Sequence, residues 1–396
     1  MSRIYDTEGL NMPRKYQSSF LSPSCSRDDI MPLSISDSRR SKARLTQGSF
    51  YFYFVSYNRL VCLEDTPKFP TMNSFPPSPH YTSGQITTYL HYIAHPSPND
   101  IPPPTFSFLK SLITHNLSTI PFDNLKLHYS HHATSSTPPY THSRAPSLDP
   151  EDLYKTIVNT GRGGYCVEMN AFFGHMLRSL GFTVKPRGAK VHMKYCLNEP
   201  GEWWAGWSHM VNLVEIEGSD WLVDVGFGGV GPVGPLLADS EEIVRGIGDM
   251  DCRVRKWGNR PAEEVEDEGM REQMRVYETR TGGGDWEPVY AFSRHVKFFR
   301  QDYEVMNWFV STNPNSWFTR RLVCMKYLRD EQSKELTGAL ILEEGIFSKR
   351  IGGEKEVLTE CKTDKERAEG LERWFGIELN EEEVKGIKKL PSVLGN

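Results

Sequence analysis

The order of apolar and polar residues divides the chain into a helical region and a region rich in strands. From Ser83 onward, apolar residues recur at helical spacing, and this spacing returns after the proline run at 102–104 and again after Asp149. Ser83 is expected to cap the first helix, and Asp149 followed by Pro150 begins the third. Downstream of Gly181, apolar and polar residues alternate, as in half-buried strands. The pattern therefore predicts an α+β protein.

The strand-rich region contains one clear hairpin, in which residues 210–216 and 221–225 alternate on either side of a turn. The charged, glycine-containing stretch 239–273 is interpreted as an insertion or mobile loop between strands. A third, mixed lobe is predicted from two further strands and an amphipathic helix, at 322–328, 339–342 and 368–375.

Residues 1–78 differ in composition from the rest of the chain. They are rich in serine and proline, and we expect a disordered extension that contributes little to a core. Residues 50–55 are an exception, because their aromatic and β-branched side chains are typical of a strand. Since Met72 directly precedes the first helical pattern, residues 1–71 are hypothesised to be dispensable.

Composition excludes several classes of protein. The 396 residues carry 46 basic and 51 acidic side chains, a formal net charge of −5, which argues against nucleic acid as a partner. No apolar run approaches the ~20 residues that a membrane-spanning helix needs. Seven cysteines, an odd number without a C-x2-C pair, favour free thiols in a reducing compartment. The sequence therefore predicts a cytoplasmic protein that binds neither nucleic acid nor membrane.

The strongest chemical signal is the segment GRGGYCVEMN at residues 161–170. Its glycines lead into a predicted helix that ends before Gly181, so that Cys166 lies in the first turn. Unpaired backbone N–H groups and the positive end of the helix dipole favour a thiolate at this position. If a cationic partner lies nearby, we expect the pKa of Cys166 to fall by several units from the free value of about 8.5, which makes the sulfur a nucleophile.

Two residues of the hairpin are candidates to activate Cys166. His209 begins one strand and Asp224 ends the next. An imidazole would take the thiol proton, and a carboxylate on its far nitrogen would orient the ring. If the turn is centred at 218–219, Asp224 faces Leu213, four residues from His209. A bulge, strong curvature or a shifted register is then required.

Structural interpretations compete with this triad. Cys166 could be a small buried side chain, His209 a packing residue among tryptophans, and Asp224 the end of a strand. A zinc site of Cys166, His192 and Cys196 is a further alternative, although the ligand spacing is irregular. The conjunction of the three residues with the glycines favours catalysis, and no metal is expected.

Three motifs occur in a fixed order, RGGYCVEMN at 162–170, WSHMVNLV at 207–214 and WLVDVGFGG at 221–229. Together they resemble the arylamine N-acetyltransferase family. Upstream, IPFDNL at 120–125 is similar to the family's P-F-E-N-L, with Asp123 in place of Glu, and residues 307–318 match a downstream segment. The resemblance covers roughly residues 80–390.

The resemblance implies three lobes around a Cys-His-Asp core like that of cysteine proteases and transglutaminases. The expected domains are an extension at 1–78, a helical bundle at 79–186, a β-barrel with His and Asp at 187–300 and an α/β lid at 301–396. Cys166 would be the nucleophile, His209 the base and Asp224 the orienting acid.

The activity implied by the resemblance is acyl transfer in a ping-pong cycle. Cys166 would accept an acyl group from acetyl-CoA or another acyl-CoA and pass it to an aromatic amine or hydrazine, as in xenobiotic detoxification. No tightly bound cofactor is expected, and the chain would be a monomer or weak oligomer. The acyl donor stays open among acetyl, propionyl and malonyl. The alternatives are a thiol hydrolase or transglutaminase-like enzyme, or an inactive acyl-CoA-binding relative.

The resemblance also assigns substrate contacts. Phe227 and Val191, with the loop glycines Gly226 and Gly228, would border the acceptor. Coenzyme A would meet a polar segment, represented by Trp308, Ser311, Thr312 and Ser316. As a phosphate-binding signature the glycine-rich loop is weak, because it lacks the Lys and Ser/Thr of a P-loop.

Two charged residues flank the proposed nucleophile. Arg162 and Glu168 are expected to form a structural ion pair that fixes its turn and takes no part in the chemistry.

Overall fold

The computed structural model describes residues 81–129, 145–196, 204–258 and 268–395. All the described residues belong to one compact unit. The expectations for residues 1–78, including the strand at 50–55, lie outside the described residues, as does the part of the charged stretch at 259–267.

The region before Gly181 is helical. Its elements are α1 (Ser83–Tyr92), α2 (Phe106–Thr119), α3 (Leu125–His128), α4 (Pro150–Tyr154), which continues as a π-helical turn (Lys155–Asn159), and α5 (Cys166–Ser179). Asp149 caps α4 as predicted. The cap of α1 is Thr82 and not Ser83, because the Thr82 hydroxyl accepts the backbone N–H of Gln85.

An eight-stranded antiparallel sheet follows, in the order β5-β4-β3-β2-β9-β8-β7-β6. Its strands are β2 (Thr183–His192), β3 (Trp204–Ile216), β4 (Ser219–Val223), β5 (Leu236–Leu237), β6 (Val244–Arg245), β7 (Met250–Lys256), β8 (Met274–Thr281) and β9 (Glu287–Ser293). Two short helices, α6 (Met193–Cys196) and α7 (Glu268–Gln273), interrupt the strands. β5 also contacts β7, which brings the sheet close to a closed barrel.

The interpretation of 239–273 as a loop is wrong for β6 and β7. Along β7, Met250, Cys252 and Val254 are buried at every second position, which is a strand pattern. The charged residues at the positions between them make this alternation hard to recognise in the sequence. Arg253 pairs with Glu278 of β8 at 2.9 Å, so part of the charge belongs to the sheet and not to a solvated insertion.

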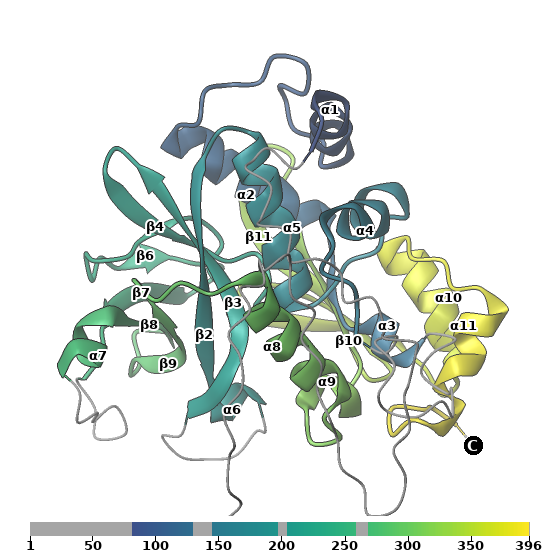
Figure 1. Ribbon diagram of the computed structural model, residues 1–396. Helices are drawn as coiled ribbons and strands as arrows, with labels where there is room; N and C mark the ends of the chain where they lie inside the picture. The colour runs from purple at the N-terminus through teal and green to yellow at the C-terminus, as the bar shows by residue number, and fades with distance from the viewer. Residues whose placement is uncertain (1–80, 130–144, 197–203, 259–267, 396) are drawn as a thin grey trace, which may run out of the picture. The chain divides into compact units, whose positions relative to one another are not determined.

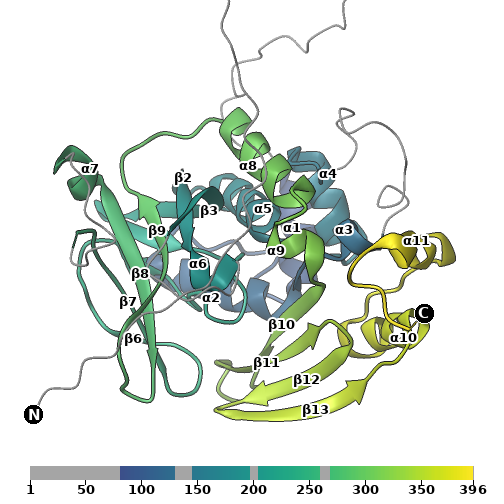
Figure 2. The ribbon, with the colours of Figure 1, turned by 90° about the horizontal axis from the view of Figure 1, so that it is seen from below.

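A second, five-stranded sheet has the order β1-β10-β11-β12-β13, and all its strand pairs are antiparallel (Figure 2). Its strands are β1 (Phe122–Asp123), β10 (Val323–Arg329), β11 (Leu336–Glu343), β12 (Ile346–Ile351) and β13 (Glu354–Glu360). The helices of this part are α8 (Arg300–Thr312), α9 (Trp317–Arg320), α10 (Asp364–Phe375), α11 (Glu381–Gly386) and a 3-10 turn (Ile387–Lys389). The sequence pattern did not reveal β12, β13 and α11.

The helix that begins at Cys166 lies at the centre of this arrangement. α5 contacts α4 and both β2 and β3, and α8 packs on β3 (Figure 1). Eleven of the fourteen residues of α5 are buried, so neighbouring elements hold the start of this helix on several sides. The predicted α+β fold with several lobes is confirmed.

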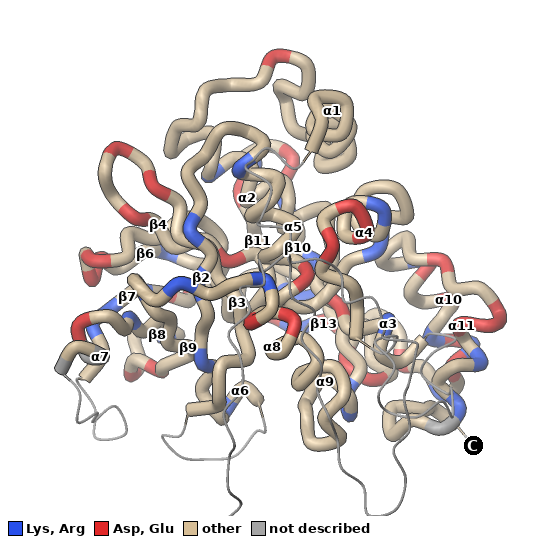
Figure 3. The backbone as a smooth tube through the Cα atoms, in the orientation of Figure 1, with Lys and Arg blue, Asp and Glu red and all other residues tan. Residues whose placement is uncertain are grey.

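Acidic and basic residues are mixed along the described part of the chain (Figure 3). Basic and acidic positions are interspersed, for example on α10 and α11 (Figure 3). Within the described ranges, no helix is long and apolar enough to cross a bilayer.

Candidate active site

The turn before Cys166 is clamped by β1. Gly163 lies so close to this strand that a Cβ atom there would be 1.8 Å from the Pro121 carbonyl oxygen, which excludes any side chain. The Asp123 carboxylate accepts the Gly163 N–H at 3.1 Å, and the Asp123 N–H donates to the Gly164 carbonyl at 3.0 Å. Burial raises the pKa of Asp123 to about 6. The IPFDNL motif therefore holds the turn before Cys166 in place.

The predicted ion pair between Arg162 and Glu168 is wrong. Arg162 instead pairs with Glu383 of α11 at 3.1 Å, and buried Glu168 pairs with Lys126 at 2.6 Å. Glu168 also accepts the Tyr165 N–H at 3.2 Å. Each charge beside Cys166 thus connects the turn to a distant segment, which proximity in sequence does not reveal.

The register of the β3–β4 hairpin resolves the predicted distance problem. Ile216 pairs with Ser219, and Glu217 and Gly218 both have positive φ, so the turn is centred one residue earlier than expected. Continued by one step, this register places Asp224 opposite Val211, two residues from His209. Diagonal neighbours of this kind are within reach of long side chains. His209 Nε2 and Asp224 Oδ2 are 2.8 Å apart, and both side chains are buried.

Asn170, one turn along α5 from Cys166, joins the helix to both strands. Its amide nitrogen donates to the Met210 carbonyl at 2.7 Å and to Asp224 Oδ1 at 2.8 Å, and its oxygen accepts the Val225 N–H at 3.0 Å. Asp224 Oδ1 also accepts the Gly226 N–H at 2.9 Å. Asn170 is fully buried. Sequence reasoning missed this role, although Asn170 lies inside the strongest motif.

The electrostatics of the pair favour a carboxylate at Asp224. Burial opposes its ionisation, but the His209 imidazole and the hydrogen bonds from Asn170 and Gly226 outweigh burial, so the pKa of Asp224 lies below its usual value. Because Asp224 holds Nε2 of the imidazole, Nδ1 is the nitrogen left for proton exchange.

The low pKa predicted for Cys166 depends on a cationic partner, and the surroundings of the thiol without one have the opposite effect. Burial and, next, the Asp224 carboxylate raise the pKa of Cys166 well above its usual value, and the Val167 N–H at the helix start lowers it only in part. The helix terminus therefore does not produce a thiolate alone, and a proton acceptor is required.

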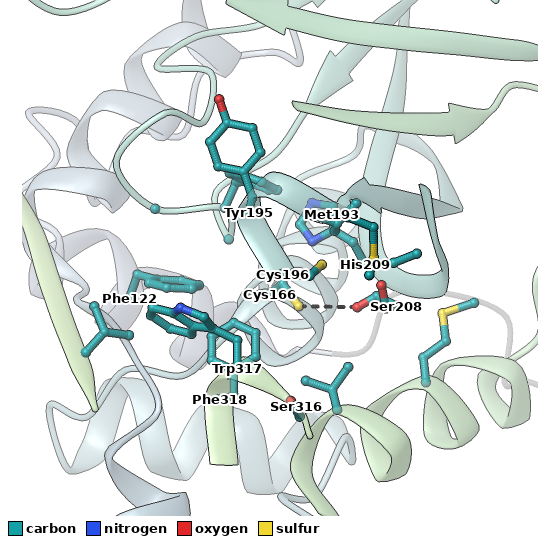
Figure 4. A pocket seen from close by; sticks show the side chains of 18 of the residues that line it. Phe122, Cys166, Met193, Tyr195, Cys196, Ser208, His209, Ser316, Trp317 and Phe318 are labelled. Carbon is teal, nitrogen blue, oxygen red and sulfur yellow. Dashed lines mark hydrogen bonds between the residues drawn. The ribbon is translucent and has the colours of Figure 1, made fainter. Parts of the chain in front are cut away.

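Cys166 and His209 line the same cavity of about 880 Å³ (Figure 4). Sγ donates a weak hydrogen bond to the Ser208 carbonyl at 3.8 Å, and among the described residues no hydrogen bond joins it to the imidazole. Proton transfer thus requires the thiol to turn from the Ser208 carbonyl toward the neighbouring ring. The volume is in the range of pockets for small organic ligands.

The residues expected to contact the acceptor all lie on the cavity wall, namely Val191, Gly226, Phe227 and Gly228. The Phe227 ring is perpendicular to the His209 imidazole, with centroids 5.2 Å apart. Gly226 is needed for packing, since a Cβ atom there would lie 2.8 Å from the Cys166 carbonyl oxygen. Because Gly226 has no side chain, the glycine-rich loop and its sheet can come close to the turn at Cys166.

The segment expected to meet coenzyme A is mostly helical. Ser316 lines the cavity, whereas the described lining does not include Trp308, Ser311 or Thr312. The Ser311 hydroxyl donates to the Asn307 carbonyl at 2.7 Å, and the Thr312 hydroxyl donates to the Trp308 carbonyl at 2.6 Å. These two hydroxyls are engaged by their own helix.

Another part of the cavity wall is apolar, and this surface was not predicted from the sequence, which assigned residues 307–318 to coenzyme A as a polar segment. It is formed by the side chains of Phe122, Val305, Met306, Phe309, Trp317 and Phe318. Figure 4 shows Phe122, Trp317 and Phe318 grouped beside Cys166. The aromatic pair Trp317–Phe318 was the available signal, because both side chains line the cavity.

The zinc alternative has no support in the described residues, where no group of three His, Cys, Asp or Glu side chains is placed to hold a metal ion. The nitrogen Nδ1 of His192 instead accepts the backbone N–H of Lys194 at 3.4 Å.

Comparison with known proteins places this chain in one class of enzyme. A family model described as N-acetyltransferase matches residues 105–384. An N-malonyltransferase of Fusarium pseudograminearum is 32% identical over 338 residues, which cover 78% of this chain and 93% of that protein. The protein is an N-acyltransferase.

Solved structures show the same fold. The arylamine N-acetyltransferase of Salmonella typhimurium superposes with a TM-score of 0.62 at 22% identity, over 78% of this chain and 98% of that one. The Mycobacterium marinum enzyme in complex with CoA gives 0.59 at 25% identity, over 77% and 99%. The chain belongs to the arylamine N-acetyltransferase family, whose co-substrate is acetyl-CoA, and the resemblance inferred from the motifs is confirmed.

Proposed function

We propose that this protein is an acyl-CoA:arylamine N-acyltransferase that works through a thioester on Cys166. The observation that carries the proposal is the buried His209–Asp224 pair, 2.8 Å apart, whose imidazole lines the same cavity as Cys166. The three residues come from α5, β3 and the end of β4, and Asn170 holds these elements together.

In the first half of the cycle, the Cys166 thiol passes its proton to Nδ1 of His209, and Asp224 stabilises the resulting imidazolium. The thiolate attacks the acyl carbonyl of acyl-CoA, and a C–S bond forms to Cys166. When the tetrahedral intermediate collapses, the bond to the CoA sulfur breaks and His209 returns the proton to that sulfur. Because one thioester replaces another, this step is close to isoenergetic.

In the second half, the amine nitrogen attacks the acyl-cysteine and loses its proton to His209, and the Cys166 sulfur leaves and is reprotonated. A weakly basic arylamine is uncharged at neutral pH, so its lone pair is available. Backbone N–H groups at the start of α5, including that of Val167, are positioned to stabilise an oxyanion beside the sulfur.

For the donor, we propose malonyl-CoA ahead of acetyl-CoA. Proteins named N-malonyltransferase are 32% and 34% identical to this chain, whereas bacterial proteins named arylamine N-acetyltransferase are 28–29% identical. We further propose xenobiotic arylamines as acceptors and a cytoplasmic location. The described cysteines, 166, 196, 252, 324 and 361, are all free thiols, which is consistent with a reducing compartment.

Intact-protein mass spectrometry with acetyl-, propionyl- and malonyl-CoA tests the proposal. One acyl group should be retained on Cys166, most from malonyl-CoA, and adding an aniline should release it as the amide. Cys166→Ala should take up none while keeping its circular dichroism spectrum, and Cys196→Ala, on the same cavity, should be acylated normally. Rapid loss of the label to water without amine would favour the hydrolase alternative, and no label at all would favour an inactive binding protein.

A further inference from the structure

A second cavity, of about 310 Å³, lies against α5 on the face away from Cys166. Successive helical residues are rotated by about 100°, so Ala171, His175 and Arg178 project roughly opposite Cys166, and all three line this cavity. The remaining wall comes from the start of α4, from β2 and β3, and from α8.

Two polar side chains of this cavity lack partners. Arg178 has a buried Nη1 without a hydrogen-bond acceptor, and no ion pair of Arg178 is found among the described residues. Tyr303 is 6% exposed, and its buried hydroxyl is likewise without a partner. Burial lowers the pKa of Arg178, and the phenol of Tyr303 is close enough to influence it. Arg178 is only partly buried, but its Nη1 is removed from water without an acceptor, which is unfavourable, so the pair is an incomplete anion site.

The two carboxylates that line the same cavity, Asp149 and Glu151, have partners other than Arg178. Asp149 caps α4 and lies 3.7 Å from Arg300. Glu151 accepts hydrogen bonds from the Gln85 amide at 3.0 and 3.3 Å. Arg300 is paired with Glu304 as well, at 2.9 Å. Arg178 is therefore the cationic group of this cavity that the described carboxylates leave without a salt bridge.

The rest of the wall is apolar and includes Leu148, Pro186, Met210 and Phe298. Such a wall suits a ligand with an apolar body. The two acidic residues disfavour a ligand with several negative charges, and the volume is at the lower end of the range for small-molecule pockets. These features select a small monoanion with an apolar body.

We propose that this cavity binds a small monocarboxylate with an apolar body. Its carboxylate would accept hydrogen bonds from the Arg178 guanidinium and the Tyr303 hydroxyl, and its apolar part would pack on the apolar wall. Bound there, it would connect α5 to α8, two helices that also contribute to the cavity of Cys166.

Isothermal titration of the full chain with benzoate tests the site. The wild type should bind benzoate, Arg178→Met should lose roughly tenfold or more in affinity, and Tyr303→Phe roughly threefold, because hydrogen bonds to a charged ligand are lost. The matched control is Arg300→Met, which removes a paired arginine of the same cavity and should change the affinity less than about twofold. Tyr303→Phe keeps the shape of the core, so it decides the question if Arg178→Met fails to fold.

Competition distinguishes the two cavities. Saturating CoA should leave benzoate binding unchanged, and Cys166→Ala should bind benzoate like the wild type. Displacement of benzoate by CoA, or equal affinity in wild type and both site variants, would overturn the proposal. Inorganic phosphate that binds in place of benzoate with the same dependence on Arg178 would overturn the assignment to a carboxylate.

Discussion

Two walls of the main cavity are built in different ways. The wall with Cys166 and His209 is supported from behind by buried polar groups, Asp224 and Asn170, and the Asn170 amide connects α5 to β3 and to Asp224. The wall from α8 and α9 is apolar, and hydroxyls near it are engaged by their own helix. The first wall fixes the geometry of the reaction, and the second offers a surface to which ligands fit. Substitutions should therefore change kcat on one side and KM on the other.

The largest effect is expected for Asp224→Asn. Asn170 and Gly226 both donate to Oδ1, so the new amide must keep its oxygen there and turn its NH2 toward His209. Nε2 then becomes an acceptor and the proton moves to Nδ1, which can no longer take the thiol proton. We expect kcat/KM to fall by about 10³-fold or more. Asp220→Asn, on the same hairpin and paired with Lys185 at the surface, should stay within about threefold. Similar losses in both variants would contradict a specific role for Asp224.

The next effect concerns the pH at which Cys166 reacts. Because burial and the Asp224 carboxylate raise the pKa of the thiol, a variant without the imidazole should lack thiolate at neutral pH. In His209→Gln, alkylation of Cys166 by iodoacetamide should be about 10²-fold slower at pH 7 and should keep rising with pH beyond the usual thiol range of about 8.5. The wild type should change far less over this range. A flat profile in His209→Gln would show that α5 alone generates the thiolate.

A smaller loss of activity, combined with a loss of stability, is expected for Asn170→Ala. The Met210 carbonyl and the Val225 N–H lose their partner in a buried region, and Asp224 loses a donor. The free energy of unfolding should fall by about 2–4 kcal/mol, and kcat should decrease about tenfold or more because Asp224 is less constrained. Urea denaturation and initial rates measure both. Asn315→Ala, at an exposed position of the cavity rim, is the control and should keep the wild-type stability.

The smallest effect is expected for the KM of the acyl-CoA, and it should differ between Ser316 and Thr312, whose hydroxyls the sequence analysis assigns equally to CoA. Ser316 lines the cavity, whereas the Thr312 hydroxyl is bonded to the Trp308 carbonyl. Ser316→Ala should raise KM for the acyl-CoA about twofold to fivefold with little change in kcat, and Thr312→Val should change neither. An equal rise in KM for both variants would mean that CoA contacts the outer face of α8.

The sequence predicts elements and motif residues well and predicts their partners poorly. Cys166, His209 and Asp224 are recognisable because each stands in a local pattern. The hairpin register is not, because a turn with Glu217 at positive φ is unusual for that residue. The partner of Arg162 lies 221 residues away, at Glu383. β7 was missed because its polar positions carry charges that pair across the sheet. Long-range pairing depends on the tertiary fold, which local periodicity does not encode.

The contacts of Arg162 with α11 can form only after α11 has been translated. Arg162 stands four residues before the sulfur, and both the Glu378 carbonyl and the Glu383 carboxylate hold its guanidinium. A ribosome releases Arg162 long before these partners have been translated. A nascent polypeptide that still lacks α11 therefore lacks the Glu383 carboxylate that holds the Arg162 guanidinium in the turn before Cys166.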